Sequence, residues 1–130
     1  MEEYPDHLPT ITLLISQALV DKYSEVAEDH NPIHKDTKAA YEDPLGKPVA
    51  HGMLVLSTAS QIMATTFGKR WAEKGSLKVR WKSPTAIPSN VWTSAQLKSV
   101  SEEQIKYEIE CKDKDDILLF SGTATLHLDD

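Results

Sequence analysis

The amino-acid sequence predicts one α+β domain in which an antiparallel sheet wraps around a buried helix. The chain has 130 residues, a length that suits a single domain over residues 1–130. Residues 52–67 are apolar or small on most faces, which is typical of a helix enclosed by other structure. Residues 76–82 and 104–112 alternate apolar and charged side chains, as strands do when one face of an antiparallel sheet meets water. A buried helix and one such sheet together indicate the α+β class.

The first half of the chain is predicted to form a short strand, a helix and a long connection. Residues 9–15 are β-prone and favour a first strand. Ser16 is a good N-cap for a helix over residues 17–27, and a proline shortly afterwards prevents that helix from continuing. Residues 28–50 then connect to the buried helix, with room for one helical turn at 36–41. A connection of this length in a compact domain is usually functional or disordered, so we expect a shaped flap over a site.

The second half of the chain is predicted to be mostly strand. The buried helix over 52–67 ends at Gly68, which is a common stop signal. A hairpin turn is expected at residues 101–103. The predicted strands are 76–82, 90–100, 104–112 and 116–128.

The charge pattern excludes one class of partner and suggests another. A formal net charge of −6 argues against a general nucleic-acid binder. Residues 69–82 nevertheless hold six basic side chains and a single acidic one, Glu73. This strip is either a solvated helix end and strand face, or a surface for a phosphorylated ligand. Arg80 and Lys82 are two apart on one predicted strand and would share a face, so they are the candidates for phosphate contact.

Other sequence features favour a protein of the cytoplasm. The chain starts with an acidic segment that lacks the pattern of a signal peptide, and its longest apolar run, ILLF, is too short to span a bilayer, so no membrane association is expected. The single cysteine, Cys111, cannot form an internal disulfide and fits a reducing compartment. Because it lies in an alternating run, we interpret Cys111 as a small core residue and not as a nucleophile.

The segment EDHNPIHKD, residues 28–36, crowds an acid, an amide and two imidazoles onto a turn. Asp29 and His34 lie five positions apart across Pro32, and a carboxylate and an imidazole so placed can exchange protons with a water or a substrate near neutral pH. Asn31 can hold either the turn or a ligand. The segment can equally be an Asx-type turn in which Asp29 and Asn31 bond only backbone amides. From these residues alone, both interpretations stay open.

Three other kinds of site are disfavoured. A zinc site would use His30 and His34, but Pro32 prevents the helix that would bring both to one face, and Cys111 is distant in the sequence, so no metal is expected. The chain has no G-x-S-x-G nucleophile elbow, and it has neither a P-loop nor a dinucleotide-binding fingerprint.

A second segment, VAHGM, stands where the buried helix is predicted to begin. Gly52 lets a ligand approach the backbone closely. Its free amide would lie at the positive end of a helix, where it can stabilise an oxyanion. The alternative is that Gly52 is a tight packing point or a plain N-cap.

The segments YSEVAEDHNPIHKDTKAA and AHGMLVLSTAS together resemble the MaoC-like hydratases, which are (R)-specific enoyl-CoA hydratases. The pattern D-x-N-P-x-H followed by H-G-M carries the resemblance, which covers residues 16–68, while the strand half matches in general layout. It implies a hot-dog fold, a curled antiparallel sheet wrapped around a long central helix. It also implies edge-to-edge pairing of two subunits and a trans-2-enoyl thioester of coenzyme A or acyl carrier protein as substrate.

The resemblance also implies roles for individual residues. Asp29 and His34 match the catalytic pair, and Gly52 matches the oxyanion-hole amide. Ser60 matches a serine that supports the active site, although it can simply be a small residue that allows close packing. No metal or redox cofactor is implied, because the carrier is part of the substrate. The residues assigned to substrate binding are Asn31, His51, Ser60, Arg80 and Lys82.

The expected assembly is a homodimer. Trp81, Trp92 and Tyr107 lie on predicted strands that carry more apolar surface than one helix can cover. The resemblance points the same way, because the family pairs its sheets.

The sequence departs from the family pattern at two places. The family has a small residue and glycine just before the aspartate, whereas this chain has Ala27 and Glu28. The N-terminus is also short and lacks the glycine-containing opening segment that is usual in the family.

The function we expect is reversible hydration of a 2-enoyl thioester, which in reverse is dehydration of a (3R)-hydroxyacyl thioester in fatty acid metabolism. A hot-dog thioesterase is one alternative, and His34 and the Asn-Pro turn speak against it. A non-catalytic acyl-CoA-binding subunit is another, and Glu28 favours it.

Overall fold

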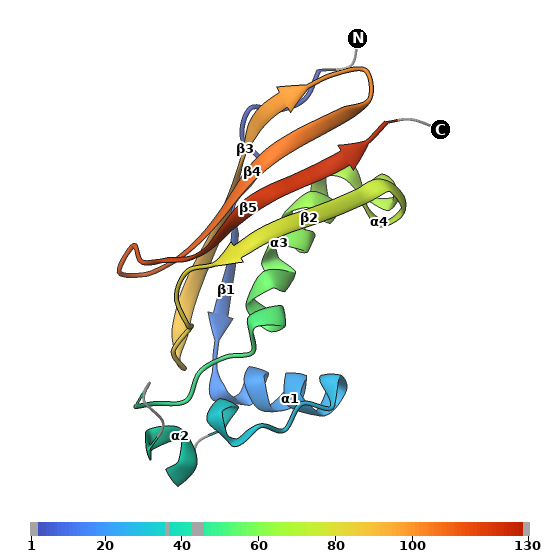
Figure 1. Ribbon diagram of the computed structural model, residues 1–130. Helices are drawn as coiled ribbons and strands as arrows, with labels where there is room; N and C mark the ends of the chain where they lie inside the picture. Colours follow the sequence, from blue (N-terminus) through green and yellow to red (C-terminus); the bar gives the residue numbers. More distant parts are fainter. Residues whose placement is uncertain (1–2, 36, 43–45, 129–130) are drawn as a thin grey trace.

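The computed structural model describes residues 3–35, 37–42 and 46–128 (Figure 1). Both long helices start and end where the sequence predicts, and the ends of the strands differ from prediction by at most two residues. The elements in chain order are β1 (Ile11–Ile15), α1 (Gln17–Ala27), the 3₁₀ turn η1 (Pro32–His34), α2 (Lys38–Glu42), α3 (Gly52–Phe67), α4 (Lys69–Lys74), β2 (Gly75–Trp81), β3 (Ser89–Val100), β4 (Gln104–Asp113) and β5 (Leu118–His127).

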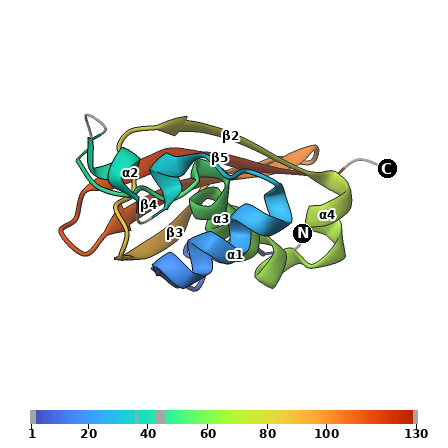
Figure 2. The same ribbon diagram turned by 90° about the horizontal axis from the view of Figure 1, so that it is seen from below.

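The sheet has five antiparallel strands in the order β1-β3-β4-β5-β2, so β1 and β2 are its edges. The helix α3 packs along one face of this sheet, with α1 beyond its first turn and α4 beyond its last (Figure 1). Seen from below, α1, α3 and α4 lie on the same side of the sheet (Figure 2). The α+β prediction is therefore confirmed. None of the helices in the described residues is both long enough and apolar enough to cross a bilayer.

The core lies between α3 and the inner face of the sheet. On β4 the alternation is complete, and its inward residues Ile105, Tyr107, Ile109 and Cys111 are fully buried. Burial raises the pKa of the Cys111 thiol, which fits the predicted core role of this residue. The inner side of α3 supplies Leu54, Val55, Thr58, Ala59, Ile62 and Met63.

The prediction that α3 is buried nearly all round is wrong for the single chain. Met53 is 63% exposed, and Ser57, Ser60, Gln61 and Ala64 are exposed as well. The physical reason is that a five-stranded sheet covers only one side of a helix, and α1 and α4 cover only its ends. An exposed stripe therefore runs along α3.

Tyr107 also differs from expectation, because it is fully buried and offers no surface to a second subunit. Its hydroxyl donates a 2.7 Å hydrogen bond to the carbonyl of Pro5, which ties the start of the chain to the sheet. Burial, together with the charge of Asp6, raises the pKa of Tyr107 to about 12.

The end of α1 sets the direction in which the chain enters the predicted site. Ser16 caps the start of α1, as predicted, by accepting a 3.1 Å hydrogen bond from the amide of Leu19. At the other end, the amides of Glu28 and Asp29 both donate to the carbonyl of Ser24. Glu28 takes the left-handed conformation, with φ of 56°. Glycine adopts this conformation with least strain, so the structure explains why the related family has glycine here.

Replacing Glu28 by glycine should therefore stabilise the fold. The left-handed conformation costs an L-residue roughly 1–2 kcal/mol, and the greater freedom of unfolded glycine offsets part of the gain, which leaves about 0.5–1 kcal/mol. Urea denaturation of Glu28→Gly should show this increase in the free energy of unfolding. Glu28→Ala is the matched control, because it removes the charge and keeps the Cβ atom. An equal gain in Glu28→Ala would assign the effect to charge and contradict the conformational explanation.

Candidate active site

The turn after α1 is built by side chains that bond its own backbone. The side-chain oxygen Oδ1 of Asn31 accepts a 3.2 Å hydrogen bond from the amide of Ile33 and thereby caps η1. Oδ1 of Asp29 accepts a 3.3 Å hydrogen bond from the amide of Asn31. Pro32 occupies the first position of η1, where its missing N–H costs nothing. The Asx-type interpretation of this segment is thus correct for one oxygen of Asp29 and for Asn31.

The imidazole of His34 has a defined orientation. Its Nδ1 lies 2.7 Å from the carbonyl oxygen of Val49, and the ring is buried. A carbonyl oxygen only accepts, so Nδ1 carries the proton and Nε2 carries the lone pair. The amide of Val49 in turn donates a 3.0 Å bond to the carbonyl of Ile33. These two bonds hold the turn against the segment that leads into α3.

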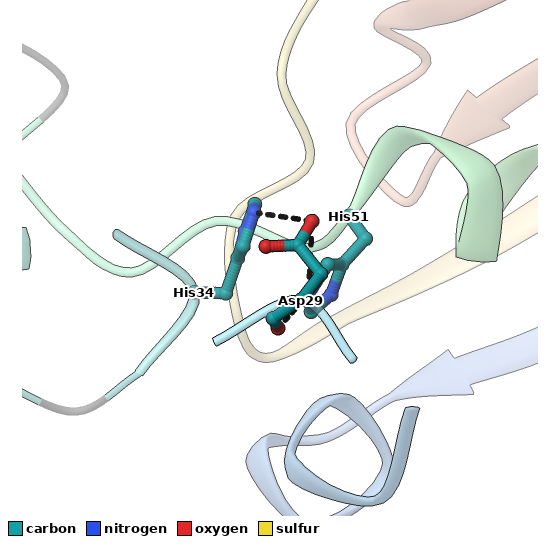
Figure 3. A group of neighbouring side chains, drawn as sticks. All are labelled: Asp29, His34 and His51. Carbon is teal, nitrogen blue, oxygen red and sulfur yellow. Dashed lines mark hydrogen bonds and ion pairs between the residues drawn. The ribbon is translucent and has the colours of Figure 1, made fainter. Parts of the chain in front are cut away.

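The second carboxylate oxygen of Asp29 faces the imidazole. Oδ2 lies 3.9 Å from Nε2 of His34 and 3.8 Å from Nε2 of His51 (Figure 3). The side chain of Asp29 is 50% exposed, so solvent reaches the group, whereas both imidazoles are buried. The gap between Oδ2 and His34 Nε2 is too long for a direct hydrogen bond and suits one water that contacts both atoms. The structure therefore brings the predicted Asp29–His34 pair together.

His51 lies behind this pair and not on a substrate-facing surface. It is 3% exposed, and its ring stacks on that of His34 with 3.7 Å between ring centroids and 27° between planes. Its Nε2 lies 3.1 Å from the carbonyl oxygen of Asp29 and 3.3 Å from the hydroxyl of Ser24. Tyr23 packs against the ring, with 4.9 Å between centroids. The predicted substrate contact of His51 is corrected, because the carbonyl and carboxylate of Asp29 lie beside its Nε2.

Asp29, His34 and His51 also have the composition of a metal site, since one ligand atom from each lies within 4.8 Å of the others. One feature of the cluster speaks against metal binding. Nε2 of His51 carries the proton that it donates to the Asp29 carbonyl. The geometry suits proton transfer better than coordination.

Gly52 lines a pocket at the start of α3. Gly52 is the first residue of α3, where a helical N–H has no acceptor within the helix. The pocket has a volume of about 440 Å³ and is lined by Ala50, Gly52, Trp81, Lys82, Ser83, Pro84 and Thr85. A Cβ atom at position 52 would lie 3.2 Å from the ring of Trp81, so glycine permits close contact with that ring. Amide, indole and lysine together can hold a polarised carbonyl and the chain attached to it.

Comparison with known proteins decides the family. The model of the MaoC like domain matches residues 1–118. The chain belongs to the MaoC-like family. The 3-hydroxyacyl-thioester dehydratase Z of Mycobacterium tuberculosis (strain CDC 1551 / Oshkosh) is 30% identical over 92 residues, which are 68% of this chain and 61% of the relative. The chain therefore spans less than two thirds of the length of this relative.

Two solved structures share the fold of this chain. The (R)-hydratase from A. caviae involved in PHA biosynthesis superposes with a TM-score of 0.81 at 19% identity, over 98% of this chain and 100% of that chain. The ChsH1-ChsH2 complex from Mycobacterium tuberculosis gives a TM-score of 0.82 at 14% identity, over 99% of this chain and 100% of that chain. The expected hot-dog fold is confirmed.

Of the remaining predicted residues in this MaoC-like chain, one lines the pocket and two do not. Lys82 lines it beside Gly52. Arg80 does not, because it alternates with Val79 and Trp81, whose side chains point toward α3, and so faces the opposite side of the sheet. Ser60 lies two turns into α3, about 12 Å along the helix from Gly52, and accepts a 3.0 Å hydrogen bond from Nε1 of Trp71. Within the described chain, Ser60 joins α3 to α4 and does not reach the cluster.

One pocket residue, Trp81, was missed as part of the site. Its sequence position predicts only an inward strand residue and apolar surface for a dimer. It is 49% exposed, and its ring forms a wall of the pocket directly over Gly52. The available signal was its place at the end of a strand on the helix-facing side.

Proposed function

We propose that this chain is a hydro-lyase that adds water to a trans-2-enoyl thioester of coenzyme A or acyl carrier protein. In reverse it would dehydrate a (3R)-hydroxyacyl thioester, a reaction type of fatty acid metabolism. The observation that carries the proposal is the placement of Asp29 Oδ2 and His34 Nε2, 3.9 Å apart, on a turn that is bound to the segment leading into α3. The dehydratase name of the M. tuberculosis relative supports it.

The chemistry follows from these three groups. The Gly52 amide donates to the thioester oxygen and stabilises the negative charge that develops there as C3 is attacked. Asp29 and His34 hold one water between them, and its oxygen bonds to C3 while the lone pair of His34 Nε2 accepts one of its protons. The pair then delivers a proton to C2, so that one water is added in total. The reaction transfers no electrons, so we propose that it needs no redox cofactor. We also propose that it uses no metal, because the Gly52 amide and the Asp29–His34 pair are assigned the carbonyl and proton-transfer roles that a metal could otherwise serve.

The pair can be tested with two variants that keep the turn. Asp29→Asn keeps an oxygen for the amide of Asn31 and removes the carboxylate. His34→Asn keeps a donor for the carbonyl of Val49 and removes Nε2. Each should lower kcat for crotonyl-CoA by roughly 10²–10⁴ while the melting temperature stays near that of the wild type.

The same assay separates the alternative functions. Loss of the enoyl absorbance indicates hydration, release of free thiol indicates a thioesterase, and neither indicates a non-catalytic binding subunit. Wild-type rates in both variants, or a loss of activity that only follows a loss of folded protein, would contradict the catalytic role of the pair.

The role of the Gly52 amide has its own test. Pro is accepted at the first position of a helix, and His51 before it already has the extended conformation, with φ of −61° and ψ of 135°, that precedes a proline. Gly52→Pro thus removes the N–H with little harm to the helix, and kcat should fall by roughly 10²–10³. Gly52→Ala is the matched control, since it adds the contact with Trp81 and keeps the N–H. If both variants lose the same activity, crowding and not the amide explains the loss.

We propose that Lys82 contacts the phosphates of the carrier, because it lines the pocket and carries a positive charge. An exposed contact of this kind contributes about 1 kcal/mol or less and weakens with salt. Lys82→Ala should raise KM for crotonyl-CoA a few-fold at low ionic strength. Arg80→Ala, which removes a charge two residues away on the other face, should leave KM unchanged. Equal effects of the two variants would show that only net charge matters.

We also propose a homodimer that joins through β2 and the exposed stripe of α3. Edge strand β2 has a row of backbone groups with no strand beside it among the described residues, and Met53 and Trp81 expose apolar surface at this side of the molecule. Sedimentation equilibrium at micromolar concentration should give twice the chain mass, and a monomer would contradict the proposal.

We propose that the protein is located in the cytoplasm, because Cys111 is buried and free. Recovery outside the cytoplasm on cell fractionation would overturn that.

A further inference from the structure

We propose that His51 is a positioning residue, whose Nε2–H holds the backbone of Asp29 so that the carboxylate keeps its place beside His34 and the start of α3. This inference rests on the proposed function and adds a residue to it. Two observations support the inference. One is the set of contacts that His51 makes, and the other is that its Nδ1 has no hydrogen-bond partner among the described residues.

The tautomer of His51 follows from its partners. Nε2 lies 3.1 Å from the carbonyl oxygen of Asp29, and because that oxygen only accepts, Nε2 carries the proton. His34 has the opposite tautomer, with its proton on Nδ1 toward Val49. The two stacked rings therefore present different groups to Asp29 Oδ2, a lone pair from His34 at 3.9 Å and an N–H from His51 at 3.8 Å. Only His34 is set up to accept a proton beside Asp29.

The ring of His51 carries a cost that a purely structural ring would avoid. Its Nδ1 is buried and has no hydrogen-bond partner among the described residues. An orphaned buried polar atom is unfavourable, and a phenylalanine at this position would stack on His34 and pack against Tyr23 without it. What phenylalanine lacks is the Nε2–H that reaches the Asp29 carbonyl. The contact that sets histidine apart from an apolar ring is therefore the one made with Asp29.

The place of His51 in the chain links the two halves of the site. It is the N-cap of α3 and directly precedes Gly52, which lines the pocket. Its side chain binds the backbone of Asp29 from across the connection of residues 28–50. One residue thus joins the carboxylate to the oxyanion amide. A shift of about 1 Å between such groups can lower a rate by 10²-fold.

Two variants separate the N–H from the ring. His51→Phe keeps the ring and removes the Nε2–H, and we expect kcat for crotonyl-CoA to fall by about 10–100-fold, with KM within about twofold of wild type and the melting temperature nearly unchanged. His51→Gln removes the ring but can place an N–H near the same carbonyl, and kcat should stay within about fivefold of wild type. A purely structural role predicts instead that activity follows the folded fraction in both variants.

The outcomes distinguish this inference from the proposed function. If wild-type protein does not hydrate crotonyl-CoA, the proposed function fails. If wild type is active and His51→Phe keeps its kcat, or His51→Gln loses as much as His51→Phe, the positioning role is overturned. If His51→Phe does not fold, nitrogen-15 NMR of the wild type decides. A proton on Nε2 of His51 supports the role, and a proton on Nδ1 overturns it.

Discussion

The hydrogen bond from Nδ1 of His34 to the carbonyl of Val49, 2.7 Å long, is the interaction on which the site depends. It joins the turn after α1 to the segment that enters α3, and the bond from the Val49 amide to the carbonyl of Ile33 reinforces it. The bond also sets the chemistry, because a proton held on Nδ1 leaves the lone pair of Nε2 for Asp29 and its water. Without it, the side chain of His34 would lose its contact with the segment that enters α3.

Asp29 shows how one side chain serves both structure and chemistry. Oδ1 accepts from the turn, while Oδ2 faces His34 and His51. The two interpretations that the sequence left open are therefore compatible. Asparagine at position 29 would keep the hydrogen bond to the amide of Asn31 and would lose the carboxylate oxygen that faces His34 and His51. A substitution at this one residue can therefore test catalysis while the turn stays intact.

Much of the fold could be predicted because its signals are local. Ser16 marks the start of α1, Gly68 marks the end of α3, and the alternation in β4 identifies its buried face. The association of Asp29 with His34 was also predictable, because both lie on one short turn that Pro32 restricts. These features depend on residues close together in the chain.

The remaining parts depend on contacts between distant segments. The bond from Trp71 to Ser60 directs that serine to α4, and nothing near Ser60 in the sequence announces it. His51 is buried behind Asp29 because the segment that enters α3 lies against the turn after α1. Tyr107 loses its expected exposure because its strand is central and its hydroxyl meets Pro5. The pattern of a strand shows which residues face inward, but not which partner they meet.

The tautomer of His34 is the most direct test of how this site works. Nitrogen-15 NMR of protein labelled at histidine, recorded near neutral pH, reports which ring nitrogen carries the proton, and the spectrum of His34→Asn assigns the signals by their absence. We expect a protonated Nδ1 and an unprotonated Nε2, as the contact with Val49 requires. A neutral His34 ring with its proton on Nε2 would contradict a site in which that atom accepts a proton from water beside Asp29.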